Sequence, residues 1–491
     1  MIAPVSIAIL ISSLIAQGIW SRSAQADFLP YCQQTTQGIN EKNAARQDPQ
    51  AKARYAEILA AHANQLRQCR AQNWLKTQAI WLRLYECDAR PGAIDEVLDR
   101  IVDRGYNEIY LETFSNGQVL LPSVSNPTAW QSIVQTPNNA DLLDQVIQKG
   151  RMRGLKVYAW MFSMNFGYSY AIKPDKQLAL LRNGRGQTSL TANTLAGLGT
   201  DLGTLNRDEA FIDPYSTAAK QDYYRMVQEV LKRRPDGVLF DYIRYPRSRG
   251  NASVATRVQD LWIYGDAARQ ALYDRASNNK GRELIKRYVD RGFLTPNDVA
   301  AVDKLFPNEK IPMWQGRTPS SLESRGSIAQ RAAILQSDLW RLSVAHAMQG
   351  VVDFLNLAIY PVQKAGLSAG AVFFPEGNST IGGGFDSRLQ PWDRFPANIE
   401  WHPMSYATCD RADCIVAQVR RVLSQAPTGT QVKPVLAGIW QQSISNRPPL
   451  EVQMEALRPL AGRISSISHF AYSWQEPQSD RDRKFCAPRS L

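Results

Sequence analysis

A carboxylate at the end of an apolar run is the feature of this sequence best suited to chemistry. Residues 236–246 read DGVLFDYIRYP, and the apolar stretch before Asp241 has the length of a buried strand. Tyr242, Arg244 and Tyr245 surround this carboxylate. A cation beside it favours the ionised form, which suits a nucleophile or a group that stabilises an oxocarbenium ion. A salt bridge between Asp241 and Arg244 that only pins the loop is the alternative interpretation.

A second carboxyl group is needed if Asp241 is to cleave a glycosidic bond, because that reaction pairs an ionised carboxylate with a protonated one. Glu376 closely follows the apolar run 370–374, whose phenylalanines would desolvate it and raise its pKa, as a general acid requires. An exposed loop glutamate is the alternative. Glu112, at the end of another apolar run, is the rival acid, although substrate positioning or core capping is favoured for it.

Aromatic and polar residues gather where other predicted strands end. The chain has 12 tryptophans and 19 tyrosines, which suits a site that stacks on the flat faces of sugars. For the tryptophans, packing at the barrel rim is an alternative of about equal weight. For His402, a structural role with its hydrogen bonds formed inside the protein is equally favoured. The candidates for substrate binding are Glu112, Trp160, Asn165, Tyr242, Arg244, Tyr245, His402, Tyr406, Trp440 and Trp474.

The elements that must position these residues form a regular alternation. Eight short apolar runs, most of them separated by amphipathic helical patterns, predict a (β/α)₈ barrel of the α/β class. An open doubly wound sheet is the alternative, but the first run lacks a G-x-G-x-x-G turn. The strands are predicted at 79–86, 108–114, 156–162, 237–242, 370–374, 400–407, 433–440 and 464–474. Active sites of such barrels lie at the C-terminal ends of the strands.

Two long stretches interrupt this alternation on the same side of the barrel. Residues 163–213 are rich in Gly, Asn and Thr, and residues 247–330 read as largely helical. Both would build walls around a groove. The barrel is expected to span 79–476, after a helical N-terminal extension over 27–78 and before a C-terminal tail over 477–491. Helices are predicted at 41–72, 94–104, 141–153, 216–234, 331–349, 415–425 and 450–460.

Several motifs together resemble the glycosyl hydrolase-like 10 family, exported bacterial barrel proteins related to α-amylase-type hydrolases. They are WLRLYECDARPGAIDEVLDRIVDRGYNEIYLET, GLKVYAWM, FIDP, DGVLFDYIRYP and HPMSYA, which cover roughly residues 79–474. The resemblance implies glycan hydrolysis, with peptidoglycan strands as a substrate of some members. In the amylase-type pattern the fourth-strand Asp is the nucleophile and a fifth-strand Glu the acid/base, roles that fall on Asp241 and Glu376.

The sequence also departs from the amylase pattern. An arginine is expected two residues before the nucleophile, where this chain has Leu239. A His-Asp pair is expected after the seventh strand, where Gln441 and Gln442 follow Trp440. Starch-like chemistry is therefore not supported.

The N-terminus predicts export. Residues 5–19 are mostly apolar and residues 24–26 read AQA, so residues 1–26 resemble a secretory signal peptide. The absence of Lys or Arg before the apolar run leaves an uncleaved anchor as an alternative. After cleavage no membrane span is expected, and the protein would be periplasmic or extracellular.

Export makes disulfides plausible for the six cysteines, which allow 15 pairings. Cys32 and Cys69 could staple the N-terminal segment, and Cys409 and Cys414 could pair locally. Neither C-x-x-C spacing nor clustered histidines occur, so no metal site and no cofactor are expected.

A net charge of +12 favours a polyanionic partner such as a cell-wall glycan, and no motif supports nucleic-acid binding. The sequence thus predicts an exported glycoside hydrolase of a bacterial glycan that works by a two-carboxylate mechanism. A non-catalytic glycan-binding barrel is the rival, and an envelope scaffold with an uncleaved anchor is a third hypothesis. The oligomeric state stays open.

Overall fold

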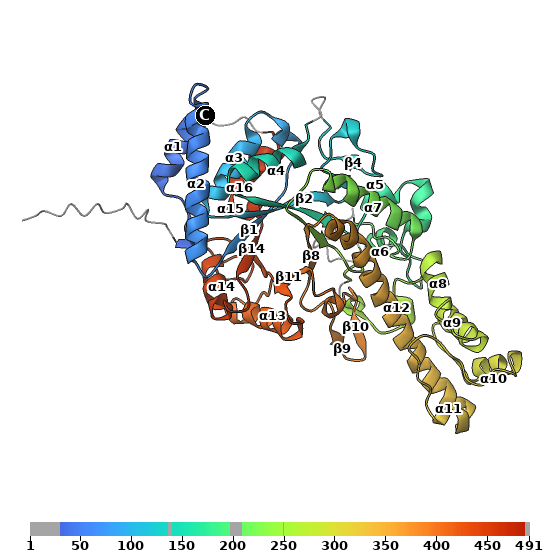
Figure 1. Cartoon of the computed structure of the whole chain (residues 1–491). Helices are drawn as coiled ribbons and strands as arrows, with labels where there is room; N and C mark the ends of the chain where they lie inside the picture. The colour runs from blue at the N-terminus through green and yellow to red at the C-terminus, as the bar shows by residue number, and fades with distance from the viewer. Residues whose placement is uncertain (1–29, 136–139, 197–208, 249, 487–491) are drawn as a thin grey trace, which may run out of the picture.

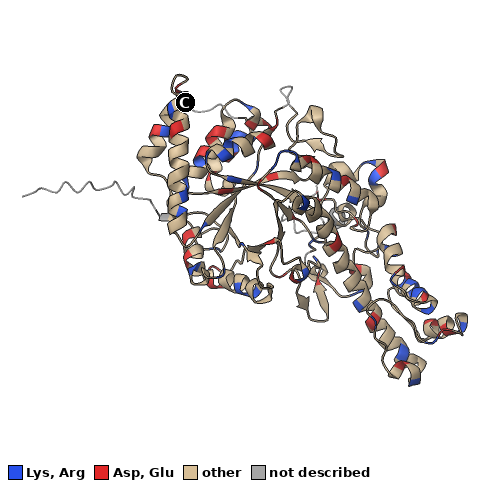
Figure 2. Ribbon diagram, in the orientation of Figure 1, with Lys and Arg blue, Asp and Glu red and all other residues tan. Residues whose placement is uncertain are grey.

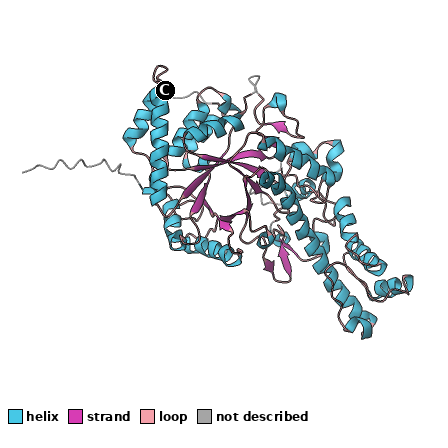
Figure 3. Ribbon diagram, viewed as in Figure 1, coloured by secondary structure: helices cyan, strands magenta, loops and turns pink. Residues whose placement is uncertain are grey.

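A closed ring of eight parallel strands forms the centre of the protein in a computed structural model, which describes residues 30–135, 140–196, 209–248 and 250–486 (Figures 1 and 3). Neighbours in the ring follow the order of the chain, and β1 closes it by pairing with both β2 and β14. The predicted (β/α)₈ barrel is therefore confirmed. Its strands are β1 (Thr77–Leu82), β2 (Glu108–Ser115), β5 (Lys156–Phe162), β6 (Gly237–Asp241), β8 (Ser368–Phe373), β11 (Glu400–Ser405), β13 (Val435–Ala437) and β14 (Ser466–Phe470).

Helices surround the ring and bury one apolar face each against it (Figure 3). The main ones are α3 (Ala93–Asp103), α4 (Leu142–Met152), α7 (Thr217–Leu231), α12 (Ile328–Lys364), α13 (Ala412–Gln425) and α14 (Leu450–Leu457). Side chains cap their starts: Asp141 accepts the N–H of Asp144 in α4, and Ser216 accepts the N–H of Ala219 in α7. Charged residues lie mostly on the helices of the protein, and few lie on the strands of the ring (Figure 2).

Inward-facing side chains fill the barrel in layers. Lys433 forms ion pairs with Glu400 (2.8 Å) and Glu108 (3.8 Å), so the layer near the strand starts is polar and buried. Above it Tyr110 of β2 meets His402 of β11 edge to face, with ring centroids 5.4 Å apart. Because β2 and β11 lie on opposite sides of the ring, this contact closes the barrel interior. A ligand would therefore bind above this layer, at the C-terminal ends of the strands.

The two insertions begin where β5 and β6 end. The first contains α5 (Tyr168–Ala171) and α6 (Ser189–Ala196). The second is largely helical, as predicted, and includes α8 (Asp266–Tyr273), α9 (Asn279–Arg291), α10 (Pro296–Leu305) and α11 (Leu322–Arg325). Figure 1 shows α9, α10 and α11 projecting away from the barrel beside the start of α12. A small sheet of β7 (Val254–Ala255), β9 (Thr380–Ile381) and β10 (Gly384–Asp386) ties this insertion to the loop after β8.

Helix α12 is longer than predicted, because it runs through Gly350, which the sequence suggested as its end. A Cβ at Gly350 would lie 2.8 Å from the Tyr215 ring, so the glycine allows close packing and does not stop the helix. By length and composition alone α12 could cross a membrane. However, 67% of its most apolar 18-residue window is buried inside the fold, so α12 is a core helix.

The N-terminal extension is two helices and not the single one predicted: α1 (Thr36–Gln47) and α2 (Lys52–Gln72). They break at Asp48, whose φ of −88° and ψ of 110° are extended because Pro49 follows it. Helix α2 packs on α3 and α4. The predicted signal peptide, residues 1–26, lies outside the described residues.

Three disulfides join the six cysteines. The two pairings that the sequence suggested are present: Cys32–Cys69 lies within the N-terminal extension, and Cys409–Cys414 closes a short loop. The third joins Cys87, just after β1, to Cys486, and so ties the C-terminal segment to the barrel. The predicted tail therefore includes an ordered helix, α16 (Pro477–Lys484), whose Arg483 pairs with buried Asp88 at 2.8 Å.

Candidate active site

Asp241 is the last residue of β6, at the C-terminal end of the fourth strand, as predicted. It is only 7% exposed. One carboxylate oxygen accepts the backbone N–H of Tyr242 at 2.6 Å. The other accepts the indole Nε1–H of Trp160 at 3.1 Å, from the neighbouring strand β5. Trp160 thus orients the carboxyl group, and its 3% exposure leaves it little surface to serve as the predicted sugar platform.

The electrostatics of Asp241 differ from the expectation. Burial raises its pKa to about 6, against opposing effects of the Tyr242 N–H, the charge of Arg244 and the Trp160 hydrogen bond. Arg244 forms no ion pair with Asp241; its guanidinium instead stacks on Tyr242, 4.4 Å from the ring centroid. The charge of Arg244 favours the ionised form of Asp241, as expected, but desolvation has the larger effect on its pKa.

Glu112 of β2 is the carboxylate whose charge acts on Asp241. It is 7% exposed, and its charge adds to the rise in the pKa of Asp241, whose largest cause is burial. Arg83 donates to Glu112 Oε2 at 2.6 Å, and Ser115 donates to Oε1 at 2.6 Å. Glu112 pairs in register with Trp160, so Trp160 lies between the two carboxylates. Both carboxylates therefore face the same end of the barrel interior.

Glu376, the predicted acid/base, lies in the loop after β8 and is half-buried. Its carboxylate accepts a hydrogen bond from Gln418 of α13, a helix of the outer layer. Arg421 of the same helix donates to the carbonyl of Pro375. Within the described residues no hydrogen bond or ion pair joins Glu376 to Asp241. Of the two, Glu112 is the carboxylate whose charge acts on Asp241, whereas Glu376 is hydrogen-bonded to a helix of the outer layer.

An aromatic group lines the same end of the barrel. Phe470, at the end of β14, lies 6.2 Å from Trp160, 6.0 Å from Tyr406 and 6.4 Å from Trp474, measured between ring centroids. Burial, and then the charge of Asp241, raise the pKa of Tyr406 well above its usual value, so this phenol lies near the carboxylate. Tyr242 stacks on Phe162 at 4.2 Å. The predicted residues Tyr242 and Tyr406 therefore lie near Asp241, and Trp474 joins the aromatic group through Phe470.

Four other predicted binding residues have structural contacts instead. His402 is fully buried in the barrel interior, hydrogen-bonded to Glu400 at 3.2 Å, and burial lowers its pKa. Asn165 accepts the backbone N–H groups of the first insertion at Gly167 and Ala210.

Tyr245 is fully buried and donates to the carbonyl of Ala347 in α12. Trp440 packs on Tyr31 of the N-terminal extension, with ring centroids 5.3 Å apart, and lies 3.4 Å from the Tyr106 hydroxyl. These contacts account for Tyr245 and Trp440 without a ligand.

Two charged residues near Asp241 were not predicted from the sequence. Arg83 is the half-exposed cation that pairs with Glu112, with its guanidinium 5.8 Å above the Trp160 ring. Glu209, from the first insertion, accepts the hydroxyl of Tyr242 at 2.9 Å. Arg83 continues the inward face of β1 beyond Trp81, so strand periodicity could have found it. Nothing in the sequence around Glu209 indicates this contact.

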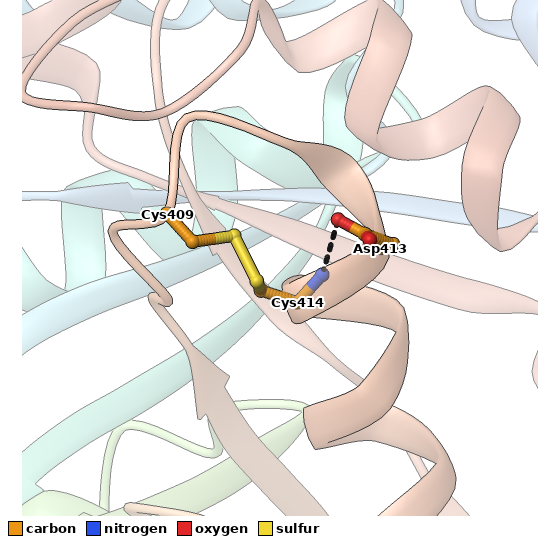
Figure 4. A group of neighbouring side chains, drawn as sticks. All are labelled: Cys409, Asp413 and Cys414. Carbon is orange, nitrogen blue, oxygen red and sulfur yellow. Dashed lines mark hydrogen bonds between the residues drawn. A yellow bond between two sulfur atoms is a disulfide. The ribbon is translucent and has the colours of Figure 1, made fainter.

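Side chains of metal-binding type gather once in the described part of the chain, at Cys409, Asp413 and Cys414. Figure 4 shows that the two cysteines form a disulfide and that Asp413 accepts the backbone N–H of Cys414 at 3.0 Å. A disulfide offers no thiolate, so this group does not have the donors of a metal site.

Comparisons with known proteins give distant structural likenesses only. No family model and no curated protein sequence match the chain, so the resemblance to the glycosyl hydrolase-like 10 family stays a prediction. The glycoside hydrolase domain of PgaB (BpsB) from Bordetella bronchiseptica is similar, at 14% identity and a TM-score of 0.46, over 84% of this chain and 99% of that domain.

Two further similar structures are β-N-acetylhexosaminidases. The family 20 exo-β-N-acetylglucosaminidase of Vibrio harveyi is 9% identical, with a TM-score of 0.38, over 84% of this chain and 57% of that one. The N-acetyl-β-hexosaminidase of Streptomyces plicatus is 9% identical, with a TM-score of 0.37, over 84% and 62%. At these values the likeness assigns neither activity nor residues to this chain.

Proposed function

We propose that this chain is an exported glycoside hydrolase that acts on a bacterial glycan, with peptidoglycan-type strands as the first candidate substrate. The observation that carries the proposal is the pair of buried carboxylates, Asp241 and Glu112, on either side of Trp160 at the C-terminal end of the barrel. Two carboxyl groups in different environments are what glycoside cleavage requires. The aromatic group around Phe470 would hold sugar rings against them.

The two environments suggest different roles. Asp241, whose burial raises its pKa to about 6, can hold a proton near neutral pH and donate it to the leaving oxygen. Glu112 forms an ion pair with Arg83 and takes the other role, as nucleophile or as base for a water. This assignment reverses the role that the sequence suggested for Asp241. Glu376 remains the alternative second carboxyl group.

The strand arrangement allows such a pair. Strands β2 and β6 flank β5, so their backbones are about 10 Å apart, which is two strand spacings. Side chains that point inward from both strands bring the carboxyl groups closer than that. Glycosidases use separations of roughly 5–9.5 Å, the shorter for retaining and the longer for inverting enzymes.

Export to the periplasm or the cell exterior is part of the proposal. Three disulfides and no free cysteine among the described residues are typical of proteins that fold in an oxidising compartment. They support the signal-peptide interpretation of residues 1–26. Mass spectrometry of the mature protein tests it, with Asp27 as the expected first residue and an intact Met1 as the contrary result.

A substrate panel tests the activity. Purified cell-wall glycan strands, intact and stripped of peptide, and a set of neutral polysaccharides are incubated with the protein, and new reducing ends are counted. The Asp241→Asn variant, purified in parallel, reports any contaminating hydrolase. Reducing ends from one glycan above the variant's level are expected. Binding without turnover on every glycan would favour the glycan-binding alternative.

A further inference from the structure

Arg244 is a buried cation without an anionic partner. It is 5% exposed, and its Nη1 donates to the backbone carbonyl of Tyr245 at 3.0 Å. Among the described residues no carboxylate lies within ion-pair distance of it. Its Nε is enclosed without any hydrogen-bond partner in the described part of the chain. Burying an uncompensated charge is costly, so a partner absent from the isolated chain would account for this arginine.

A nearby arginine shows what Arg244 lacks. Arg388 lies over the same Phe374 ring, at 4.5 Å from the centroid, where Arg244 lies at 5.7 Å. Arg388 is neutralised by Asp386, with which it makes two side-chain hydrogen bonds of 2.7 and 2.8 Å. Among the described residues, the fold therefore supplies a carboxylate to one of these two buried arginines and none to the other.

Aromatic rings hold the Arg244 guanidinium in place. Tyr242 lies 4.4 Å from it, Phe211 5.6 Å and Phe374 5.7 Å, measured to the ring centroids. Such cation–π contacts fix the plane of the guanidinium but do not compensate its charge fully. A cation that is pre-positioned in this way has little conformational freedom left to lose when an anion binds.

The position of Arg244 relates it to Asp241. It follows Asp241 by three residues, and its charge opposes the rise that burial causes in the pKa of Asp241, so the two groups are electrostatic neighbours. Tyr242 lies between them in the chain and packs against the guanidinium. A sugar that presents its glycosidic oxygen to Asp241 would thus place its substituents within reach of Arg244.

We infer that Arg244 binds a carboxylate on the sugar held at Asp241, so that the substrate is a glycan of acidic sugars. The inference rests on the proposed function for the position of the sugar. A guanidinium is the side chain best matched to a carboxylate, and the net charge of +12 would draw polyanionic chains toward the protein. The carboxylate belongs either to a hexuronate or to a lactyl ether on an amino sugar.

Equilibrium binding tests the inference separately from hydrolysis. Titration calorimetry is carried out with Asp241→Asn protein, which prevents turnover, on oligogalacturonates and on peptide-free cell-wall strands. Each ligand is also used after its carboxyl groups are reduced to alcohols. We expect reduction to weaken binding of one acidic ligand by about 10- to 100-fold, the range of a hydrogen bond to a charged group. The ligand that responds identifies the source of the carboxylate.

Substitutions assign that effect to Arg244. In Arg244→Gln the reduced and unreduced ligands should bind about equally, and Arg244→Lys should keep part of the difference. Arg247→Gln is the matched control, because Arg247 is an exposed arginine on the same loop, and it should keep the full difference. Circular dichroism checks that each variant is folded; if the Gln variant is not, the comparison of reduced and unreduced ligands still decides.

The outcomes separate this inference from the proposed function. The carboxylate site is overturned if each ligand binds equally well with its carboxyl groups intact and reduced. It is also overturned if Arg244→Gln weakens binding of the intact and the reduced ligand by the same factor. Either result counts even if the protein hydrolyses a neutral glycan. A carboxylate preference that depends on Arg244 supports the site even if the unsubstituted protein shows no hydrolysis, in which case only the hydrolase proposal fails.

Discussion

Replacing Asp241 by asparagine should make the protein more stable at alkaline pH relative to acidic pH. The buried carboxyl group has its pKa raised from 3.8 to about 6, so ionising it in the folded state costs about 3 kcal/mol more than in the unfolded chain. The neutral form is the one that the fold favours. Stability is therefore lost as the pH rises from about 4 through 6, and it stays constant above that.

Asparagine removes this titration. One hydrogen bond is lost at every pH, because the amide offers a single acceptor to the Tyr242 and Trp160 N–H groups. The difference between variant and unsubstituted protein nonetheless changes by about 2 kcal/mol in favour of the variant between pH 4 and pH 8. For a chain of this length that corresponds to a relative change in Tm of about 2 °C.

Scanning calorimetry at pH 4, 5, 6, 7 and 8 measures this change. Asp213→Asn is a matched variant, because burial also raises the pKa of Asp213 to about 6, although its oxygens accept the N–H groups of Tyr215 and Ala268. It should show a trend of the same sign. A Tm difference for Asp241→Asn that is constant from pH 4 to pH 8 would refute the raised pKa, and with it the proposed role of Asp241 as an acid.

Two further predictions concern the second carboxyl group and the pH profile. Glu112→Gln should lower kcat by about 10²- to 10⁴-fold. Glu376→Gln should keep kcat within about threefold of the unsubstituted protein, because Gln418 holds Glu376 on the outer layer. Steady-state kinetics on the best substrate of the panel measure both values, and a larger loss for Glu376→Gln would make Glu376 the second catalytic carboxyl group. As a general acid, Asp241 should make kcat/KM fall as the pH rises above about 6. Trp160→Phe removes a hydrogen bond that lowers the pKa of Asp241, so the alkaline limb should move to higher pH. An alkaline limb that does not move, or a kcat/KM that keeps rising as the pH passes through about 6 to 8, contradicts the assignment.

Most of the barrel could be predicted because its strands are continuous apolar runs. A strand buried on both faces leaves that signature in the sequence, and GVLFD of β6 is an example. The end of α12 could not be predicted, since Gly350 stops a helix or admits a close neighbour, and only the position of Tyr215 decides between these two roles. The break after α1 could have been inferred from Pro49, which disfavours helical backbone at Asp48.

The site was predicted in part. Asp241 follows from its place at the end of a strand, but its surroundings depend on which side chains point inward. Glu112 shares the inward face of β2 with Tyr110, which strand periodicity alone could indicate. Glu376 was expected near Asp241 because their strands are neighbours. A loop residue beyond a strand end can instead turn outward, as the hydrogen bond from Gln418 shows.

The basic charge illustrates the same limit. The composition alone shows a net +12 but not which cations lack partners. Many arginines are tied to the fold, as Arg153 is by Asp99 at 2.9 Å and Arg483 by Asp88. Only the three-dimensional arrangement distinguishes these from Arg244, which the sequence suggested as a salt-bridge partner of Asp241.

The most direct test of the central claim is to compare turnover and binding for Asp241→Asn on whichever glycan the unsubstituted protein cleaves. If Asp241 is one of two catalytic carboxyl groups, kcat should fall by at least about 10²-fold, while the dissociation constant for the glycan stays within about threefold. A variant that retains turnover within tenfold of the unsubstituted protein would contradict the account and move the chemistry to another carboxyl group.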